Sequence, residues 1–197
     1  MNKANKITIS RIIMSLVIII LLLFPFDQLN YEFPTYLIGG KIIVDLKYVI
    51  AGILFIIASV TDFLDGYVAR KYNLITDFGK MVDAIADKLL VNSVLIILAC
   101  NGKISCVIAV VIVIRDIIVD SIKMVIGNKG AAVAAIKVAK VKTASLMVGV
   151  VLTLFSNLPF ELLSLRISDY LLALAAILSV ISAVKYYIMA KPYLTER

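Results

Sequence analysis

Long blocks of apolar residues, separated by short polar segments, form the main hydrophobic pattern of this chain. About 20 mostly apolar residues, each adding roughly 1.5 Å to a helix, are enough to cross the ~30 Å hydrocarbon core of a bilayer. Since backbone groups inside lipid must satisfy their own hydrogen bonds, such blocks predict helices. The pattern predicts six transmembrane helices, roughly at Ile7–Phe24, Leu46–Val68, Phe78–Ala99, Ile104–Ile126, Val138–Phe155 and Tyr170–Ala190.

The composition also indicates an integral membrane protein. Hydrophobic residues make up 62% of the 197 residues and the mean hydropathy is +1.06, whereas soluble domains contain about 45–50% apolar residues. No repeat or linker interrupts the pattern, so we predict one all-α membrane domain over residues 1–197. The first block is not followed by a small-residue cleavage site, and we interpret it as a retained helix.

The charge distribution predicts an orientation in the membrane. The net charge of +7 favours anionic lipid as a partner, and no nucleic acid is expected. Lys and Arg concentrate in the loops that share a side with both termini, while the opposite loops hold Lys41, Lys47, Lys103 and Arg166. Because cytoplasmic loops retain positive residues, we expect a multi-pass protein of the cell membrane with both termini in the cytoplasm.

Carboxylates must carry the chemistry of this chain. Histidine is absent and both cysteines, Cys100 and Cys106, lie in or beside apolar stretches, which excludes His-dependent catalysis and Cys/His metal sites. Asp62 and Asp65 are three residues apart, and Asp83 and Asp87 are four apart, so each pair shares one helix face. The short link between the two helices makes them antiparallel neighbours, and the four carboxylates are expected to converge.

Four carboxylates within a membrane require compensating positive charge. Each ionised aspartate costs at least ~2.5–3.5 kcal/mol in the bilayer, and Arg70, on the same face, balances only part of the charge. Oxygen-only ligands favour Mg²⁺ or Mn²⁺, and two such ions ~3.5–4 Å apart form the usual clamp for displacement at phosphorus. Gly66 and Ala69 leave room for a ligand or, alternatively, form a helix-packing seam. Arg70 meets a phosphate or, alternatively, only marks the cytoplasmic rim.

The complete pattern resembles the signature of the CDP-alcohol phosphatidyltransferases. It reads Asp62-x-x-Asp65-Gly66-x-x-Ala69-Arg70, then eight residues, then Gly79-x-x-x-Asp83-x-x-x-Asp87. The resemblance implies six transmembrane helices, commonly a homodimer, and a cavity that faces the cytoplasm and binds two divalent metals. It implies that all four aspartates contribute to the metal site and that Asp83 and Asp87 are catalytic, with Asp87 as the base. It also implies that the CDP group is bordered by Asp65, Gly66, Ala69, Arg70 and Gly79.

Three further segments resemble the bacterial phosphatidylglycerophosphate synthases within that family. Asn5-x-x-Thr8-x-x-Arg11 resembles a segment that opens their first helix near the active site, so Asn5 and Thr8 are expected to contact the CDP group. Arg115-Asp116 through Lys123, and Lys140-Val141-Lys142-Thr143, resemble a second and a third conserved stretch. An acceptor that carries a phosphate needs cations at the cavity. The predicted acceptor-phosphate residues are Arg115, Lys123, Lys137, Lys140 and Lys142.

These observations predict transfer of a phosphatidyl group from CDP-diacylglycerol to sn-glycerol 3-phosphate, giving phosphatidylglycerophosphate and CMP. Several alternatives remain open. The lysines could only mark the cytoplasmic face, and Arg115 could pair with Asp116 or Asp120. The residues Ala84, Ser121, Ile122, Lys123 and Ala139 differ from those usual in the synthases, so the acceptor could instead be inositol phosphate, serine or phosphatidylglycerol. The acidic helices could also belong to a transporter or a prenyltransferase.

Overall fold

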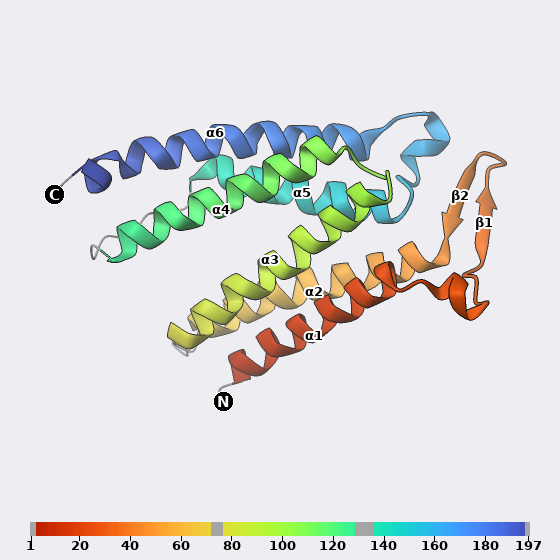
Figure 1. The fold of residues 1–197 in the computed structure, drawn as a ribbon, viewed down its shortest axis with the longest axis horizontal. Coiled ribbons are helices and arrows are strands. Elements are labelled where there is room, and N and C mark those ends of the chain that lie inside the picture. The colour runs from red at the N-terminus through yellow and green to blue at the C-terminus, as the bar shows by residue number, and fades with distance from the viewer. Residues whose placement is uncertain (1–2, 72–76, 129–135, 196–197) are drawn as a thin grey trace.

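Each of the six apolar blocks folds as an α-helix (Figure 1). The computed structural model describes residues 3–71, 77–128 and 136–195. The helices are α1 (Lys3–Leu23), α2 (Leu46–Lys71), α3 (Asp77–Cys100), α4 (Cys106–Asn128), α5 (Lys137–Leu154) and α6 (Ile167–Thr195). Two short 3₁₀ turns, Phe26–Leu29 and Phe160–Leu163, lie in the connections. The helical fold predicted from the hydrophobic pattern is confirmed.

One of these helices has both the length and the composition of a membrane span. Among the residues described, the segment Ile167–Tyr193 of α6 meets both criteria, and Thr8–Leu23 of α1 is a shorter apolar helix. Helix α4 is strongly apolar, but it does not meet both criteria because it contains several charged residues, among them Arg115, Asp116 and Asp120. By length and composition, α6 is therefore long and apolar enough to cross a membrane.

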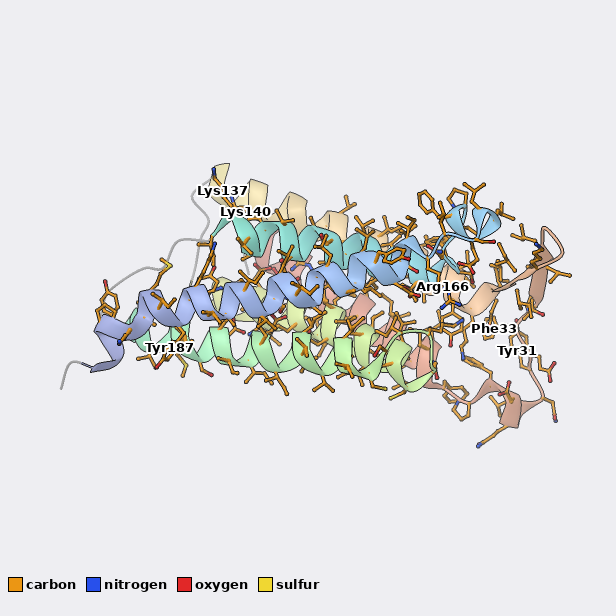
Figure 2. The ribbon with its side chains drawn as sticks, turned by 90° about the horizontal axis from the view of Figure 1, so that it is seen from above. Tyr31, Phe33, Lys137, Lys140, Arg166 and Tyr187 are labelled. Carbon is orange, nitrogen blue, oxygen red and sulfur yellow. The ribbon has the colours of Figure 1, made fainter. Side chains whose placement is uncertain are left out.

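The helices pack as two groups that meet along the bundle. Helix α1 packs on α2 and α3, and α6 packs on α5 and α4, while contacts between α2 and α5 and between α3 and α4 join the groups. The start of α1 and the end of α6 lie at the same end of the bundle (Figure 1). Lys137 and Lys140 also lie at that end, whereas Arg166 lies at the other (Figure 2). The fold thus separates two groups of cations along its long axis.

The buried side chains of α1 are polar at one end of the helix and apolar at the other. Thr8, Arg11 and Ser15 are buried at one end and Ile18 and Leu22 at the other, with spacings of three and four residues that keep them on one side of the helix. The apolar end joins a core made by side chains from five other helices. That core includes Phe55, Val94, Leu98, Ile112, Val150 and Leu172. The polar end of the stripe leads toward the predicted site.

A β-hairpin, which the hydrophobic pattern did not predict, occupies the connection between α1 and α2. Strands β1 (Thr35–Ile38) and β2 (Ile42–Asp45) are antiparallel, with Ile38 opposite Ile42. The turn uses Gly39 and Gly40 at φ of +62° and +70°, where a side chain would be strained. Ile42 and Val44 are buried while Ile43 is exposed, so alternation along β2 anchors the hairpin to the bundle.

Candidate active site

Three helices meet at an ion cluster near the polar end of α1. The Arg11 guanidinium is completely buried, with a side-chain exposure of 0%. Its Nη1 atom contacts Oδ1 of Asp62 on α2 and donates a hydrogen bond of 2.8 Å to Oδ1 of Asp83 on α3. The two carboxylates are partly open, with side-chain exposures of 39% and 52%. One buried cation therefore joins two acids that face accessible space.

The donor set of this cluster fits a hard divalent cation. Both carboxylate oxygens reach the same nitrogen atom of Arg11, so a single cation can contact Asp62 and Asp83 together. Carboxylate oxygens are preferred ligands of Mg²⁺ and Mn²⁺. Within the described residues, no group of three or more His, Cys, Asp or Glu side chains gathers around one point. The side chain of Asp65 lies outside that part of the structure.

Asp87 belongs to a neighbouring pocket. The structure brings Asp62 and Asp83 together, but Asp87, one turn further along α3, lines a small pocket between α3, α4 and α5. Asp116 and Lys142 line the same pocket. The described acids of the motif thus occupy two adjoining places, Asp62 and Asp83 at Arg11 and Asp87 on the wall of this pocket. Asp87 remains close enough to interact electrostatically with Asp62 and Asp83.

The Asp116 carboxylate organises two of the predicted phosphate-binding cations. It accepts hydrogen bonds from Lys142 Nζ at 2.9 and 3.1 Å and from Arg115 Nη1 at 2.7 Å. Arg115 Nη2 also donates to Ser182 Oγ of α6 at 2.7 Å. Lys142 is buried, with a side-chain exposure of 5%. The cluster of Arg115, Asp116 and Lys142 has a net positive charge and lies next to Asp87.

The other predicted phosphate-binding lysines lie further out. Lys123 Nζ stands 5.1 Å from the centre of the Tyr186 ring, and the Arg115 guanidinium carbon stands 5.9 Å from the same ring. Tyr186 of α6 therefore links Lys123 to Arg115. Lys137 and Lys140 are exposed on the first turn of α5, at the end of the bundle where the chain begins and ends (Figure 2).

The residues predicted to border the CDP group lie on three helices. Thr8 is buried one turn before Arg11 on α1, and Gly79 lies half-buried in the first turn of α3. The others occupy helical backbone positions, and their surroundings fall outside the described part of the structure. They are Asn5 on α1 and Asp65, Gly66, Ala69 and Arg70 on α2.

Comparison with known proteins identifies the family. The CDP-alcohol phosphatidyltransferase family profile matches residues 1–182. This chain belongs to that family. It is 40% identical over 186 residues to the CDP-diacylglycerol–glycerol-3-phosphate 3-phosphatidyltransferase of Bacillus subtilis strain 168, covering 94% of this chain and 93% of that protein. Proteins of the same name from Rickettsia typhi and Rickettsia felis are 33% and 32% identical, covering 98% and 84% of this chain and 98% and 99% of their own lengths.

Several residues of this family member were not predicted as parts of the site. The sequence pattern included Arg11 only as the last residue of a motif, although its side chain contacts both acids. Asp116 and Tyr186 contact the cations that were predicted to bind the acceptor phosphate, and neither was assigned to the site. A signal for Arg11 exists in the sequence, because Thr8, Arg11 and Ser15 form a polar stripe on an otherwise apolar helix. Tyr186 has no comparable local signal.

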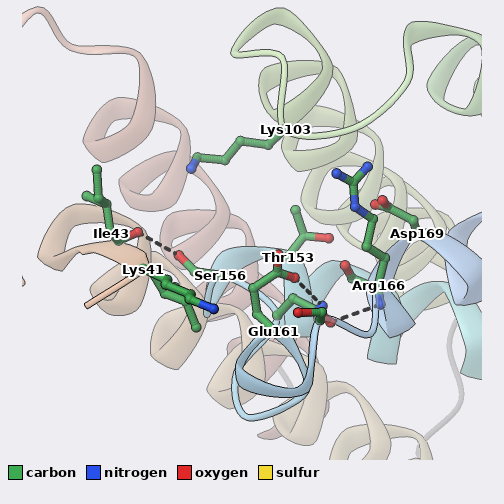
Figure 3. Close-up of a pocket in the computed structure, with 12 residues that line it drawn as sticks. Lys41, Ile43, Lys103, Thr153, Ser156, Glu161, Arg166 and Asp169 are labelled. Atoms are coloured by element: carbon green, nitrogen blue, oxygen red, sulfur yellow. Dashed lines mark hydrogen bonds between the residues drawn. The ribbon is translucent and has the colours of Figure 1, made fainter. Parts of the chain in front are cut away.

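A second polar cavity lies at the opposite end of the bundle (Figure 3). It has a volume of about 500 Å³ and is lined by cations from three separate connections, Lys41, Lys103 and Arg166, and by the acids Glu161 and Asp169. Asn157 connects the segments that form its wall. Its side-chain amide donates to Glu161 Oε2 and to the Leu165 carbonyl oxygen, and its Oδ1 atom accepts from the Ser168 amide. None of the predicted site residues lines this cavity, so it is separate from the candidate active site.

An apolar groove runs between α2 and α5 on the side of the bundle. Phe55, Ile56 and Val60 of α2 and Val148 and Val151 of α5 line it, and its volume is about 380 Å³. Ser59, which also lines the groove, lies three residues before Asp62 on the same face of α2. The groove therefore leads along the same helix toward the Arg11 cluster.

Proposed function

We propose that this chain transfers the phosphatidyl group of CDP-diacylglycerol to sn-glycerol 3-phosphate, producing phosphatidylglycerophosphate and CMP. The observation that carries the proposal is the net positive cluster of Arg115, Asp116 and Lys142 beside Asp87. A phosphate-bearing acceptor bound there would have its hydroxyl groups near a carboxylate. The names and the coverage of the similar proteins support the same reaction.

In the proposed reaction, a hydroxyl oxygen of the acceptor attacks the phosphorus on the diacylglycerol side of the pyrophosphate. The bond from that phosphorus to the oxygen of CMP breaks, and CMP leaves with the electron pair. Asp87 accepts the hydroxyl proton. Lys142 and Arg115 hold the acceptor phosphate by charge-assisted hydrogen bonds.

Asp62 and Asp83, with Asp65, are the residues that would hold Mg²⁺ or Mn²⁺ in this mechanism. A divalent metal neutralises charge on the attacking and leaving oxygens when it is bound. The family is in general divalent-metal dependent, and the paired oxygens of Asp62 and Asp83 support its use here. Thr8 and Gly79, with the motif residues of α2, would contact the CDP group.

We place all six helices across the membrane, with the Lys137 end in the cytoplasm. Large apolar side chains are exposed on the outer faces of the helices, including Ile13, Ile53, Ile114 and Ile177, and lipid would cover them. The groove between α2 and α5 would take an acyl chain of the donor. A homodimer is part of this proposal through the family resemblance.

The reaction is tested with purified protein in detergent or lipid nanodiscs. CDP-diacylglycerol is supplied with labelled glycerol 3-phosphate, inositol phosphate, serine or phosphatidylglycerol in parallel, with Mg²⁺ or Mn²⁺. We expect CMP release and labelled phosphatidylglycerophosphate with the first acceptor. A labelled lipid product formed only with another acceptor would overturn the acceptor assignment and leave the transfer chemistry intact.

Two aspartate variants separate the proposed roles. Asp87→Asn should abolish turnover and retain CDP binding, because it removes the proton acceptor and leaves the Asp62–Asp83 pair. Asp62→Asn should lose metal-dependent CDP binding. Turnover near the wild-type rate in Asp87→Asn, or unchanged CDP binding in Asp62→Asn, would exclude the corresponding role.

A further inference from the structure

Arg11 supplies a positive charge at the position between the two carboxylates of the proposed metal site. Its Nη1 atom contacts Oδ1 of Asp62 and lies 2.8 Å from Oδ1 of Asp83. The two acids come from different helices, and the guanidinium comes from a third. Arg11 therefore ties α1, α2 and α3 together at this point.

The backbone position of Arg11 is fixed by the core of the protein. The side chain is completely buried, and residues on both sides of it in the α1 stripe, Thr8 and Ser15, are buried as well. The Ser15 hydroxyl donates to the Arg11 carbonyl oxygen at 2.8 Å within the helix. A buried guanidinium needs anionic partners, because an uncompensated buried charge is strongly destabilising. Asp62 and Asp83 meet that need.

A divalent ion on the same two oxygens would conflict with this contact. Mg²⁺ binds carboxylate oxygens at about 2.0–2.1 Å, a shorter distance than that between Arg11 Nη1 and Asp83 Oδ1. Two cations sharing the same pair of oxygens would also repel each other strongly in a site of low dielectric. The guanidinium charge therefore opposes metal binding at these oxygens, and a bound metal weakens the contact of Arg11 with them.

We propose that Arg11 is a built-in competitor of the divalent metal, which holds Asp62 and Asp83 together until the metal displaces it. This inference rests on the proposed function, because it takes these acids as metal ligands. It gives Arg11 two opposing effects. Arg11 stabilises the three-helix junction before metal binds, and it weakens the apparent affinity for the metal.

The test measures Mn²⁺ affinity and thermal stability of the purified full-length protein, without substrate. Arg11→Met removes the competing charge and keeps an unbranched side chain of similar reach. We expect Mn²⁺ to bind at least ~10-fold more tightly, since a hydrogen bond to a charged group is generally worth that factor or more. Without metal, the melting temperature should fall, and saturating Mn²⁺ should restore most of the loss.

Two further variants make the result decisive. Lys185→Met removes an exposed cation of α6, so it controls for the general loss of positive charge and should change Mn²⁺ affinity less than about twofold. Arg11→Gln retains hydrogen-bond donors without the charge and should shift the Mn²⁺ affinity in the same direction as Arg11→Met. It replaces Arg11→Met in the test if the methionine variant does not fold.

The outcomes distinguish this inference from the proposed function. Wild-type protein that binds Mn²⁺ and releases CMP, combined with unchanged or weaker Mn²⁺ binding in both Arg11 variants, would overturn the competition and leave the enzyme assignment standing. Wild-type protein that binds no Mn²⁺ would overturn the competition together with the proposed metal site. Tighter binding in the Arg11 variants, but not in Lys185→Met, supports the competition.

Discussion

Replacing Lys142 with methionine tests the acceptor pocket most directly. Lys142 is buried, and its ammonium group donates to both oxygens of Asp116, at 2.9 and 3.1 Å. An ammonium group has three N–H donors. Two of them bind the Asp116 carboxylate, and the third can donate to an acceptor phosphate. Methionine keeps the unbranched, flexible stem and removes the charge, which limits the change to electrostatics and hydrogen bonding.

The structure sets the size of the expected effects. Loss of one hydrogen bond to a charged group costs about 1.5–3 kcal/mol, which corresponds to a rise of roughly 10- to 150-fold in the KM for glycerol 3-phosphate. Asp116 keeps its 2.7 Å bond from Arg115 in this variant. The loss of folding stability should therefore stay below the ~3–5 kcal/mol typical of a buried charge that loses every partner.

The assay determines KM for each substrate separately, with initial rates of CMP release by Lys142→Met. The KM for CDP-diacylglycerol should change less than about threefold, because the donor binds elsewhere in the proposal. Lys185→Met provides the matched control, since Lys185 is exposed on α6 and has no role in the proposed site. Thermal denaturation in the same detergent reports whether the variant is folded.

A folded Lys142→Met protein with an unchanged KM for glycerol 3-phosphate would refute the acceptor pocket. An equal rise in the KM for both substrates would also refute it, because a general distortion of the site affects donor and acceptor alike. In either case, the ion pair between Lys142 and Asp116 would serve only to join α4 to α5.

The remaining predictions concern packing, the donor and the metal. Gly52→Ala places a Cβ 2.7 Å from the Phe155 ring and should lower the free energy of unfolding by about 1–3 kcal/mol. Gly127→Ala is the control, because a Cβ there meets nothing within 4 Å. Thermal denaturation compares the two variants. Val148→Trp fills the groove between α2 and α5 and should raise the KM for long-chain CDP-diacylglycerol more than for a short-chain analogue. Chelation with EDTA should abolish CMP release, and added Mg²⁺ or Mn²⁺ should restore it.

Sequence alone determined the six helices and the identity of the acidic residues. The apolar blocks are local patterns, and a helix is formed by hydrogen bonds between residues four positions apart. The spacing of Asp62 and Asp83 within their motif likewise identified the family, which the match over residues 1–182 confirms. The hairpin was missed because its pairing depends on Ile42 and Val44 packing against the bundle, and no strand pattern of comparable length marks it.

Tertiary structure decided which charges meet. Arg11 and Asp83 are 72 positions apart, and Arg115 and Ser182 are 67 apart, so their contacts depend on how each helix is rotated about its axis and against which neighbour it packs. Helical periodicity places Asp83 and Asp87 on one broad face, but it does not specify that one meets α1 while the other meets α4 and α5. That assignment follows from the packing of the buried side chains, which fixes the rotation of the helices and so brings Arg11 between two acids.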